Sequence, residues 1–202
     1  SRDHCEKIID VFNEGIGGVD IHKVDRIAYT AGPGLLGALI VGESFAQGLA
    51  FALDKPLIPV NHLEAHFLSP FLDFPEIQYP FTSLLISGGH SLIVDVKDFE
   101  DYEIIGQSLD DAVGEAFDKV GKLLQLPYPG GPHIEEAAKN GDPVKYDFPR
   151  PMKNSDDLNL SFSGLKTAVL YATKDLDISE ERSNISASFQ EAVIDVLSTK
   201  IK

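Results

Sequence analysis

The stretch RIAYTAGPGLLGALIVGESFAQGLAFALDKPLIPVNHLEAH, residues 26–66, decides the fold class of this chain. Runs rich in β-forming residues at 26–30 and 56–60 predict two strands, and each is followed by a stretch that predicts a helix. Because a strand–helix–strand–helix order is typical of a parallel sheet covered by helices, the sequence predicts an α/β fold. The first helix, 35–53, is almost wholly apolar and carries three glycines. We expect it to be buried on most sides, with its glycines allowing close backbone approach.

The pattern changes near residue 80, where Phe74-Pro75 and Tyr79-Pro80 interrupt the chain. Three runs after this point predict an antiparallel meander with a turn at Gly88-Gly89, followed by helices and one long loop. The other expected elements are a helix at 5–14, strands at 81–87, 91–96 and 102–105, helices at 111–124, 132–139, 164–173 and from 180 onward, and a loop at 140–159. We therefore expect two α/β domains, 1–78 and 79–202, with a cleft between them.

The composition is that of an ordinary globular protein and excludes several classes. The 202 residues are 43% apolar and 24% charged, which excludes wholesale disorder. A lone Cys5 excludes a disulfide framework and a cysteine-built zinc site. No uninterrupted apolar run reaches the roughly 18 residues of a membrane span, and no signal-peptide pattern opens the chain, so we expect a cytoplasmic protein without membrane contact.

The charge balance limits the kind of nucleic-acid contact that the chain can make. It has 17 basic and 32 acidic side chains, a formal charge of −15. Phosphate contacts need Lys and Arg, so any nucleic-acid partner would have to meet positive surface supplied largely from elsewhere.

The two ends suggest a piece of a longer protein. There is no initiating Met, and the last predicted helix meets no Gly or Pro before residue 202. This helix has an apolar stripe at Ile185, Phe189, Val193 and Val196. We expect truncation at both ends.

His62 and His66 lie four residues apart at the start of a predicted helix, so both imidazoles are expected on one face, close enough to share a metal ion. Glu64 lies about 200° around the helix from His62, and with Asn61 it approximates a capping box. In zincins the glutamate directly follows the first histidine, so a metalloprotease is only weakly indicated. The alternative is a pair of surface histidines. A metal site would need a third ligand, with a carboxylate the expected type.

Two glycine-containing loops are candidate anion sites. Ser87-Gly88-Gly89-His90 is expected to have backbone amides free to face a phosphate or carboxylate, although a plain hairpin has the same pattern. Tyr128-Pro129-Gly130-Gly131-Pro132 leads into a helix with Pro132 expected at the first helical position. An ordinary capped loop explains this second segment equally well.

An acidic helix follows the meander. Asp111, Glu115, Asp118 and Lys122 are expected to share one of its faces, and Ser108 together with Asp111 could cap its first turn. Such a face is usually simply solvated. A carboxylate that faces a cleft could instead accept hydrogen bonds from ribose hydroxyls.

Taken together, these motifs resemble the tRNA threonylcarbamoyladenosine transferases, a family formerly labelled O-sialoglycoprotein endopeptidases. The matching segments cover nearly the whole chain, in the family's order: Ala31-Gly32-Pro33-Gly34, His62-Leu63-Glu64-Ala65-His66, Ser87-Gly88-Gly89-His90, Tyr128-Pro129-Gly130-Gly131-Pro132, Phe148-Pro149-Arg150-Pro151-Met152 and Ser161-Phe162-Ser163-Gly164-Leu165-Lys166-Thr167. The resemblance implies the actin-like ATPase fold of sugar kinases and Hsp70, in which two related α/β domains surround a nucleotide cleft.

The resemblance also implies two sets of site residues. The family's H-x-E-x-H histidines bind iron or zinc, which points to His62 and His66. The implied substrate contacts are Leu85, Ile86, Ser87, Gly88, Gly89, Asp118, Gly131 and, where the family often has Asp, Glu135. The family's first strand, an asparagine substrate contact and the aspartate that completes the metal site would lie outside this chain. We therefore expect the chain alone to be inactive.

The chemistry that the resemblance implies is acyl transfer. The threonylcarbamoyl group of threonylcarbamoyl-adenylate would pass to N6 of the adenosine beside a tRNA anticodon, with one divalent metal ion polarising the carbonyl. The implied partners are tRNA, a paralogous subunit and an ATPase of the same pathway.

Three rival functions remain open at this level. An ATPase or kinase of the same fold would leave the histidine pair unexplained. A metallopeptidase would need Glu64 elsewhere. A catalytically silent scaffold subunit would have no need of His62 and His66.

Overall fold

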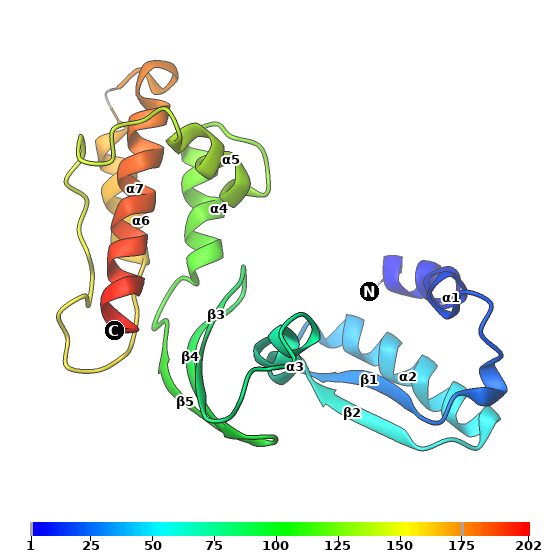
Figure 1. Cartoon of the computed structure of the whole chain (residues 1–202). Coiled ribbons are helices and arrows are strands. Elements are labelled where there is room, and N and C mark those ends of the chain that lie inside the picture. Colours follow the sequence, from blue (N-terminus) through cyan, green and yellow to red (C-terminus); the bar gives the residue numbers. More distant parts are fainter. Residues whose placement is uncertain (1, 175) are drawn as a thin grey trace. The chain divides into compact units, whose positions relative to one another are not determined.

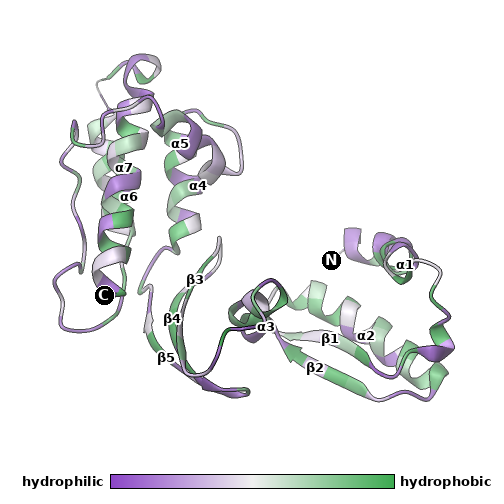
Figure 2. Cartoon of the chain, in the orientation of Figure 1, coloured by the Kyte–Doolittle hydropathy of each residue, from purple (hydrophilic) through white to green (hydrophobic). Residues whose placement is uncertain are grey.

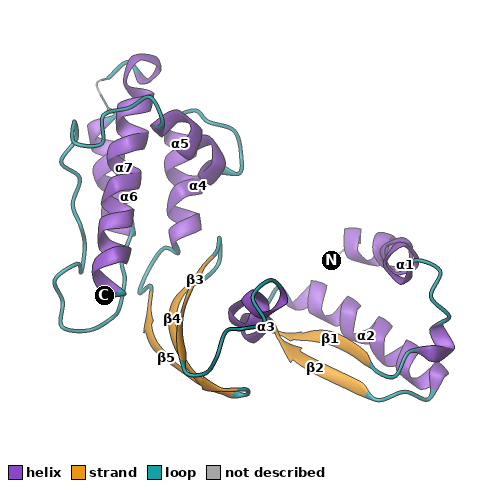
Figure 3. Cartoon of the chain, in the orientation of Figure 1, coloured by secondary structure: helices purple, strands orange, loops and turns teal. Residues whose placement is uncertain are grey.

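The computed structural model describes residues 2–174 and 176–202, and the chain divides into two compact units, Ser1–Ile77 and Gln78–Lys202. Helices and strands alternate in the first unit, whereas the second has a sheet followed by helices (Figure 3). The predicted α/β class is confirmed, and it agrees with the actin-like ATPase fold that the resemblance implies.

The first unit is built around two parallel strands (Figure 1). β1 (Ile27–Gly32) and β2 (Leu57–Asn61) pair from Ile27 opposite Leu57 to Thr30 opposite Val60. The connection between them is α2 (Leu36–Leu53), as the strand–helix–strand pattern predicts. The remaining elements are α1 (Arg2–Ile16), the short 3-10 helix η1 (Ile21–Lys23), α3 (His62–Leu68) and the 3-10 helix η2 (Ser69–Leu72).

The expectation that α2 is buried on most sides is wrong for this unit. Only Ala46 and Ala50 are buried, while Leu36 is 73% and Phe51 92% exposed. A Cβ added at Gly42 or Gly48 would meet nothing within 4 Å, so these glycines mark no close backbone approach. The reason is that a two-stranded sheet is too narrow to cover more than one side of an 18-residue helix.

The hydropathy of α2 is high along most of its length (Figure 2). By length and composition it is the one helix of the described residues that could cross a membrane, although Glu43 interrupts it. Core helices of soluble proteins pass the same test, so the finding is weak evidence for a membrane.

The second unit begins with the predicted meander. β3 (Phe81–Ile86), β4 (Ser91–Asp98) and β5 (Asp101–Gln107) form an antiparallel sheet in sequence order. Ile86 pairs with Ser91, so the first turn is the four-residue loop Ser87–His90 rather than a two-residue glycine turn.

Four helices follow the sheet and enclose the main core. They are α4 (Val113–Leu123), α5 (Gly130–Ala138), α6 (Ser163–Ala172) and α7 (Ile178–Lys200). The predicted stripe on α7 is confirmed as core: Ile185, Phe189, Val193 and Val196 are at most 1% exposed. They pack with residues of the other helices and with Phe148 and Leu160 of the long loop.

The first turns of α4 and α5 differ from those predicted. α4 begins at Val113, and its first amide donates to Ser91 Oγ (2.8 Å), whereas Ser108 Oγ donates to the carbonyl of Asp111 (2.6 Å). The predicted Ser108–Asp111 cap is therefore wrong, because a strand residue takes that role. α5 begins at Gly130, so Pro132 is its third residue rather than its first.

Candidate functional site

The two histidines lie on the first turns of α3, directly after β2. Asn61 caps this helix, since its Oδ1 accepts hydrogen bonds from the amides of Leu63 (2.9 Å) and Glu64 (3.3 Å). The cap fixes the helix start so that His62 and His66 share a face. Their Nε2 atoms are 3.2 Å apart and their ring centroids 4.5 Å apart.

The spacing of these two nitrogens fits shared metal coordination. With metal–nitrogen distances of about 2.05 Å, a 3.2 Å separation corresponds to an N–metal–N angle of about 100°, close to tetrahedral. The same separation is also that of an imidazole–imidazole hydrogen bond. Within the described residues no group of three His, Cys, Asp or Glu side chains could hold a metal ion, so a metal site here would need a ligand in addition to this pair.

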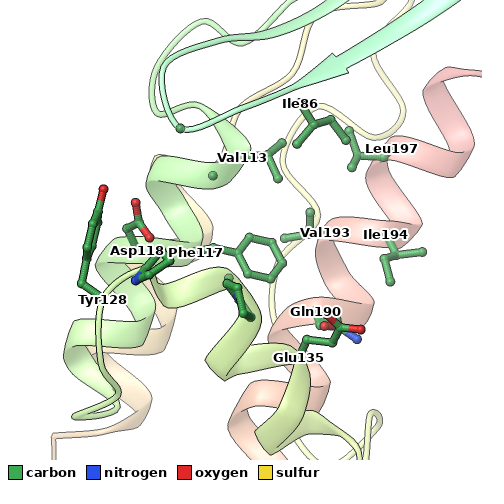
Figure 4. A pocket seen from close by; sticks show the side chains of 15 residues that line it. Ile86, Val113, Phe117, Asp118, Tyr128, Glu135, Gln190, Val193, Ile194 and Leu197 are labelled. Atoms are coloured by element: carbon green, nitrogen blue, oxygen red, sulfur yellow. The ribbon is translucent and has the colours of Figure 1, made fainter. Parts of the chain in front are cut away.

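A second candidate site is a cavity of about 570 Å³ in the second unit (Figure 4). It lies between the end of β3, the helices α4 and α5, and α7. Its lining residues are Ile86, Gly88, Val113, Gly114, Phe117, Asp118, Tyr128, Pro129, Gly131, Pro132, Glu135, Gln190, Val193, Ile194 and Leu197. The cavity is thus largely apolar with a few polar groups, a combination typical of ligand sites.

Five of the substrate residues implied by the resemblance come together in this cavity. Ile86, Gly88, Asp118, Gly131 and Glu135 all line it, although they are spread over 50 positions of the sequence. Three others do not line it. Leu85 is buried in β3, and Ser87 and Gly89 lie in the adjoining loop.

The expected free amides of the Ser87–His90 loop are mostly engaged. Ser87 N–H donates to the His90 carbonyl (2.8 Å), and the amides of Gly89 (3.3 Å) and His90 (2.9 Å) donate to Ser87 Oγ. Within the described residues only Gly88 N–H has no such partner in the loop. The loop therefore offers a ligand one amide rather than a cradle of several, because Ser87 Oγ accepts hydrogen bonds from two of the others and the His90 carbonyl accepts one from the third.

Asp118 is the polar group best placed to bind a ligand. One carboxylate oxygen, Oδ1, accepts a hydrogen bond from the amide of Gly130 (2.7 Å). Among the residues that the structure describes, Asp118 and Glu135 are the only charged ones that line the cavity. Two carboxylates without a lining cation favour ligand hydroxyl or amine donors over phosphate groups.

The predicted acidic face of α4 is rearranged in the structure. Asp111 precedes the helix and forms an ion pair with Lys119 (2.7 Å), which also pairs with Glu115 (2.9 Å). Only Asp118 of that set lines the cavity. Of the three predicted acidic residues, Asp111 and Glu115 therefore pair with Lys119, and Asp118 lines the cavity.

Several lining residues were not anticipated from the sequence. Phe117 and the α7 residues Gln190 and Ile194 carry no motif that suggests a ligand contact. Ile194 is 47% exposed and lies next to the buried stripe of α7. An apolar residue beside that stripe is the one feature of the sequence that could have indicated a contact surface here.

Comparison with known proteins decides the family. A family model described as TsaD, tRNA N6-adenosine threonylcarbamoyltransferase, matches residues 1–202. The chain belongs to this family. The TsaD match spans both histidines and all of the cavity, so both candidate sites lie within the matched residues.

Curated TsaD relatives are similar along the whole chain. The tRNA N6-adenosine threonylcarbamoyltransferase of Neisseria meningitidis serogroup A is 51% identical over 213 residues, and the protein of the same name from Neisseria gonorrhoeae is equally similar. That of Dichelobacter nodosus is 48% identical over 206 residues. Each match covers 100% of this chain and 60% of the relative, so the chain spans about 60% of the length of these relatives.

Proposed function

We propose that the full-length protein transfers the threonylcarbamoyl group from threonylcarbamoyl-adenylate to N6 of the adenosine beside the tRNA anticodon. The TsaD match over all 202 residues carries this proposal. The cavity supports it, because five of the eight implied substrate residues converge there. A peptidase is not favoured, because Glu64 does not directly follow the first histidine as the glutamate of zincins does, and the curated relatives are named as transferases.

The lining of the cavity suits the adenosine part of the substrate. Asp118 Oδ2 is available to accept hydrogen bonds from ribose hydroxyls, because Gly130 occupies only Oδ1. Ile86, Val113 and Phe117 offer apolar surface to the base. Binding in this way would orient the acyl group for attack by the amine. The cavity would thus accelerate the reaction by positioning the reactants rather than by acid–base catalysis.

His62 and His66 would hold the metal ion, iron or zinc, with a third ligand outside this chain. A divalent ion bound there supplies a Lewis acid that polarises the carbonyl under attack. The 3.2 Å spacing of the two Nε2 atoms supports this assignment.

The net charge supports a shared tRNA interface. At −15 the chain supplies little positive surface, so the paralogous subunit, the ATPase partner or other parts of the protein would provide most phosphate contacts. A single-stranded anticodon loop suits recognition through splayed bases. Such an assembly would work in the cytoplasm.

Nucleoside mass spectrometry of tRNA tests the proposal. Cells depleted of the full-length protein should lose threonylcarbamoyladenosine, and the wild type should restore it. Rescue by His62→Ala/His66→Ala should fail, whereas His22→Ala, an exposed histidine on η1, should rescue fully. If depletion leaves the modification intact, the transferase proposal is wrong and an ATPase or kinase of this fold is favoured.

Metal content tests whether His62 and His66 bind a metal ion, separately from whether the protein is a transferase. Purified full-length wild type and His22→Ala should contain equal amounts of bound iron or zinc, and His62→Ala/His66→Ala should contain at least about tenfold less. Equal metal content in all three proteins would discard the histidine site and leave the transferase proposal standing.

A further inference from the structure

Helices α4 and α5 approach each other at two glycines. A Cβ added at Gly121 would lie 2.9 Å from the Cα of Gly130. A Cβ added at Gly130 would lie 2.5 Å from the carbonyl oxygen of Phe117 and 2.8 Å from the Cα of Asp118. Cβ contacts below 3.0 Å are essentially never seen, and the obstructing atoms are backbone. A side chain at position 130 would therefore push α5 away from α4.

This close approach brings the Gly130 amide to Asp118. The amide donates to Asp118 Oδ1 at 2.7 Å, while Pro129, the residue that precedes the helix, makes no side-chain cap. Asp118 thus satisfies an amide at the start of α5 from a neighbouring helix. In return, Gly130 holds one oxygen of a carboxylate that lines the cavity, and in the described residues the other oxygen, Oδ2, has no hydrogen-bond partner.

Gly130 itself is buried and does not line the cavity. Its neighbour Gly131 lines the cavity, and a Cβ there would meet nothing within 4 Å. The two adjacent glycines therefore differ: Gly131 leaves open space in the cavity, and Gly130 holds a side chain that lines it.

We propose that Gly130 is a positioning residue, which orients Asp118 toward the adenylate substrate through its backbone N–H and which no larger residue can replace. This inference rests on the proposed transferase function. A hydrogen bond to a carboxylate is stronger than a neutral one and restricts the orientation of the side chain. Displacing the amide frees Asp118 to rotate, so the substrate should bind more weakly while the bound substrate still reacts.

Steady-state kinetics of the full-length enzyme with its partner subunits, tRNA and threonylcarbamoyl-adenylate tests the inference. Gly130→Ala should raise KM for the adenylate by about tenfold or more, with kcat within about threefold of wild type. Gly164→Ala is the matched control and should leave KM and kcat unchanged, because its Cβ would meet Pro151 at an ordinary 3.7 Å.

A double-mutant cycle separates positioning from a general loss of structure. If Gly130 acts through Asp118, adding Gly130→Ala to Asp118→Ala should raise KM by less than about twofold more. Multiplicative effects, or an unchanged KM in Gly130→Ala, would overturn the inference. A wild type without transfer activity would instead overturn the proposed function, and with it the substrate named for this site.

A direct measurement covers the case in which Gly130→Ala does not fold. The amide of Gly130 should exchange with deuterium at least about tenfold faster in Asp118→Ala than in wild type, because its acceptor is gone. An unchanged exchange rate shows that the bond to Asp118 does not hold in solution and would also overturn the inference.

Discussion

Asp110 explains why two serines flank Phe162 at the start of α6. Its carboxylate accepts hydrogen bonds from the hydroxyls of Ser161 and Ser163 (2.6 Å each) and from the amides of Phe162 (2.8 Å) and Ser163 (3.2 Å). Burial acts to raise the pKa of Asp110, but these four hydrogen bonds outweigh it and lower the pKa to about 2. A residue 53 positions before the first residue of α6 thus caps this helix.

Replacing Asp110 by Ala should lower the free energy of unfolding by about 1–2 kcal/mol at neutral pH, the usual cost of a lost cap. Because the folded pKa lies below the ordinary value of 3.8, this stabilisation is present above about pH 4 and is lost as the pH falls through about 2. Urea unfolding of wild type and Asp110→Ala from pH 7 down to 2 should therefore show a gap that closes on acidification. Asp156→Ala, at an exposed position, serves as the control; a gap independent of pH would contradict the assignment.

Gly114 supports the loop before the cavity. A Cβ there would lie 2.7 Å from the Ser87 carbonyl oxygen and 2.8 Å from the Gly88 nitrogen, and the Gly114 amide donates to that same carbonyl (3.2 Å). Gly114→Ala should therefore destabilise the protein by about 1–3 kcal/mol, the usual cost of overpacking. Gly164→Ala, with an ordinary contact, should be neutral or slightly stabilising. Thermal unfolding followed by circular dichroism compares the two, and equal melting temperatures would show that the loop can move aside.

At the scale of elements, side chains near the end of α7 bind the long loop, residues 140–159, by hydrogen bonds and ion pairs. The Lys200 side chain is only 3% exposed, and its Nζ donates to Ser155 Oγ (2.7 Å), to the Ser155 carbonyl (3.1 Å) and to the Asp157 carbonyl. Earlier in the same helix, Asp195 pairs with Lys153 (2.7 Å) and Arg150 (3.1 Å). The loop is ordered by these contacts with α7 rather than by secondary structure of its own.

Lys200→Met should lower the free energy of unfolding by about 2 kcal/mol, because it leaves two loop carbonyls without their charged donor. Hydrogen exchange should speed up in residues 151–160 and stay unchanged in β3–β5. Lys202→Met removes an exposed charge and is the matched control. If both variants exchange alike, the buried lysine does not hold the loop.

At the scale of the whole molecule, the two units differ in their cores. The main hydrophobic cluster lies entirely in the second unit, whereas the buried apolar residues of the first are Ala46, Ala50 and Phe67 among those described. Since burial of apolar area is the dominant stabilising term, the second unit holds most of the stability of this chain.

Residues 78–202 produced alone should therefore unfold cooperatively, whereas residues 1–77 alone should show no cooperative transition. Thermal unfolding of each piece, followed by circular dichroism and by the dispersion of NMR amide signals, distinguishes them. A cooperative transition in residues 1–77 would show that its half-buried contacts suffice for folding. Absence of a transition in residues 78–202 would show that its core depends on the first unit.

Local patterns predicted the elements well, since hydrophobic periodicity and turn residues act over a few positions. The parallel strands, the meander and the α7 stripe were all visible in this way. The burial of α2 was not, because exposure depends on how much surface the neighbouring elements offer. The start of α4 was missed for a similar reason: its first amide is satisfied by Ser91, 22 residues earlier in the chain.

The sequence alone therefore determined the α/β class, the order of the elements, the family resemblance and the four-residue spacing that places His62 and His66 on one helix face. Only the tertiary structure decided which residues meet at the cavity and that the Gly130 amide holds Asp118. It also decided that most amides of the Ser87–His90 loop form hydrogen bonds within the loop. The physical reason is that periodicity and capping are local properties of the chain. A hydrogen bond between helices, or a glycine that admits a neighbouring backbone, exists only once separate elements have packed.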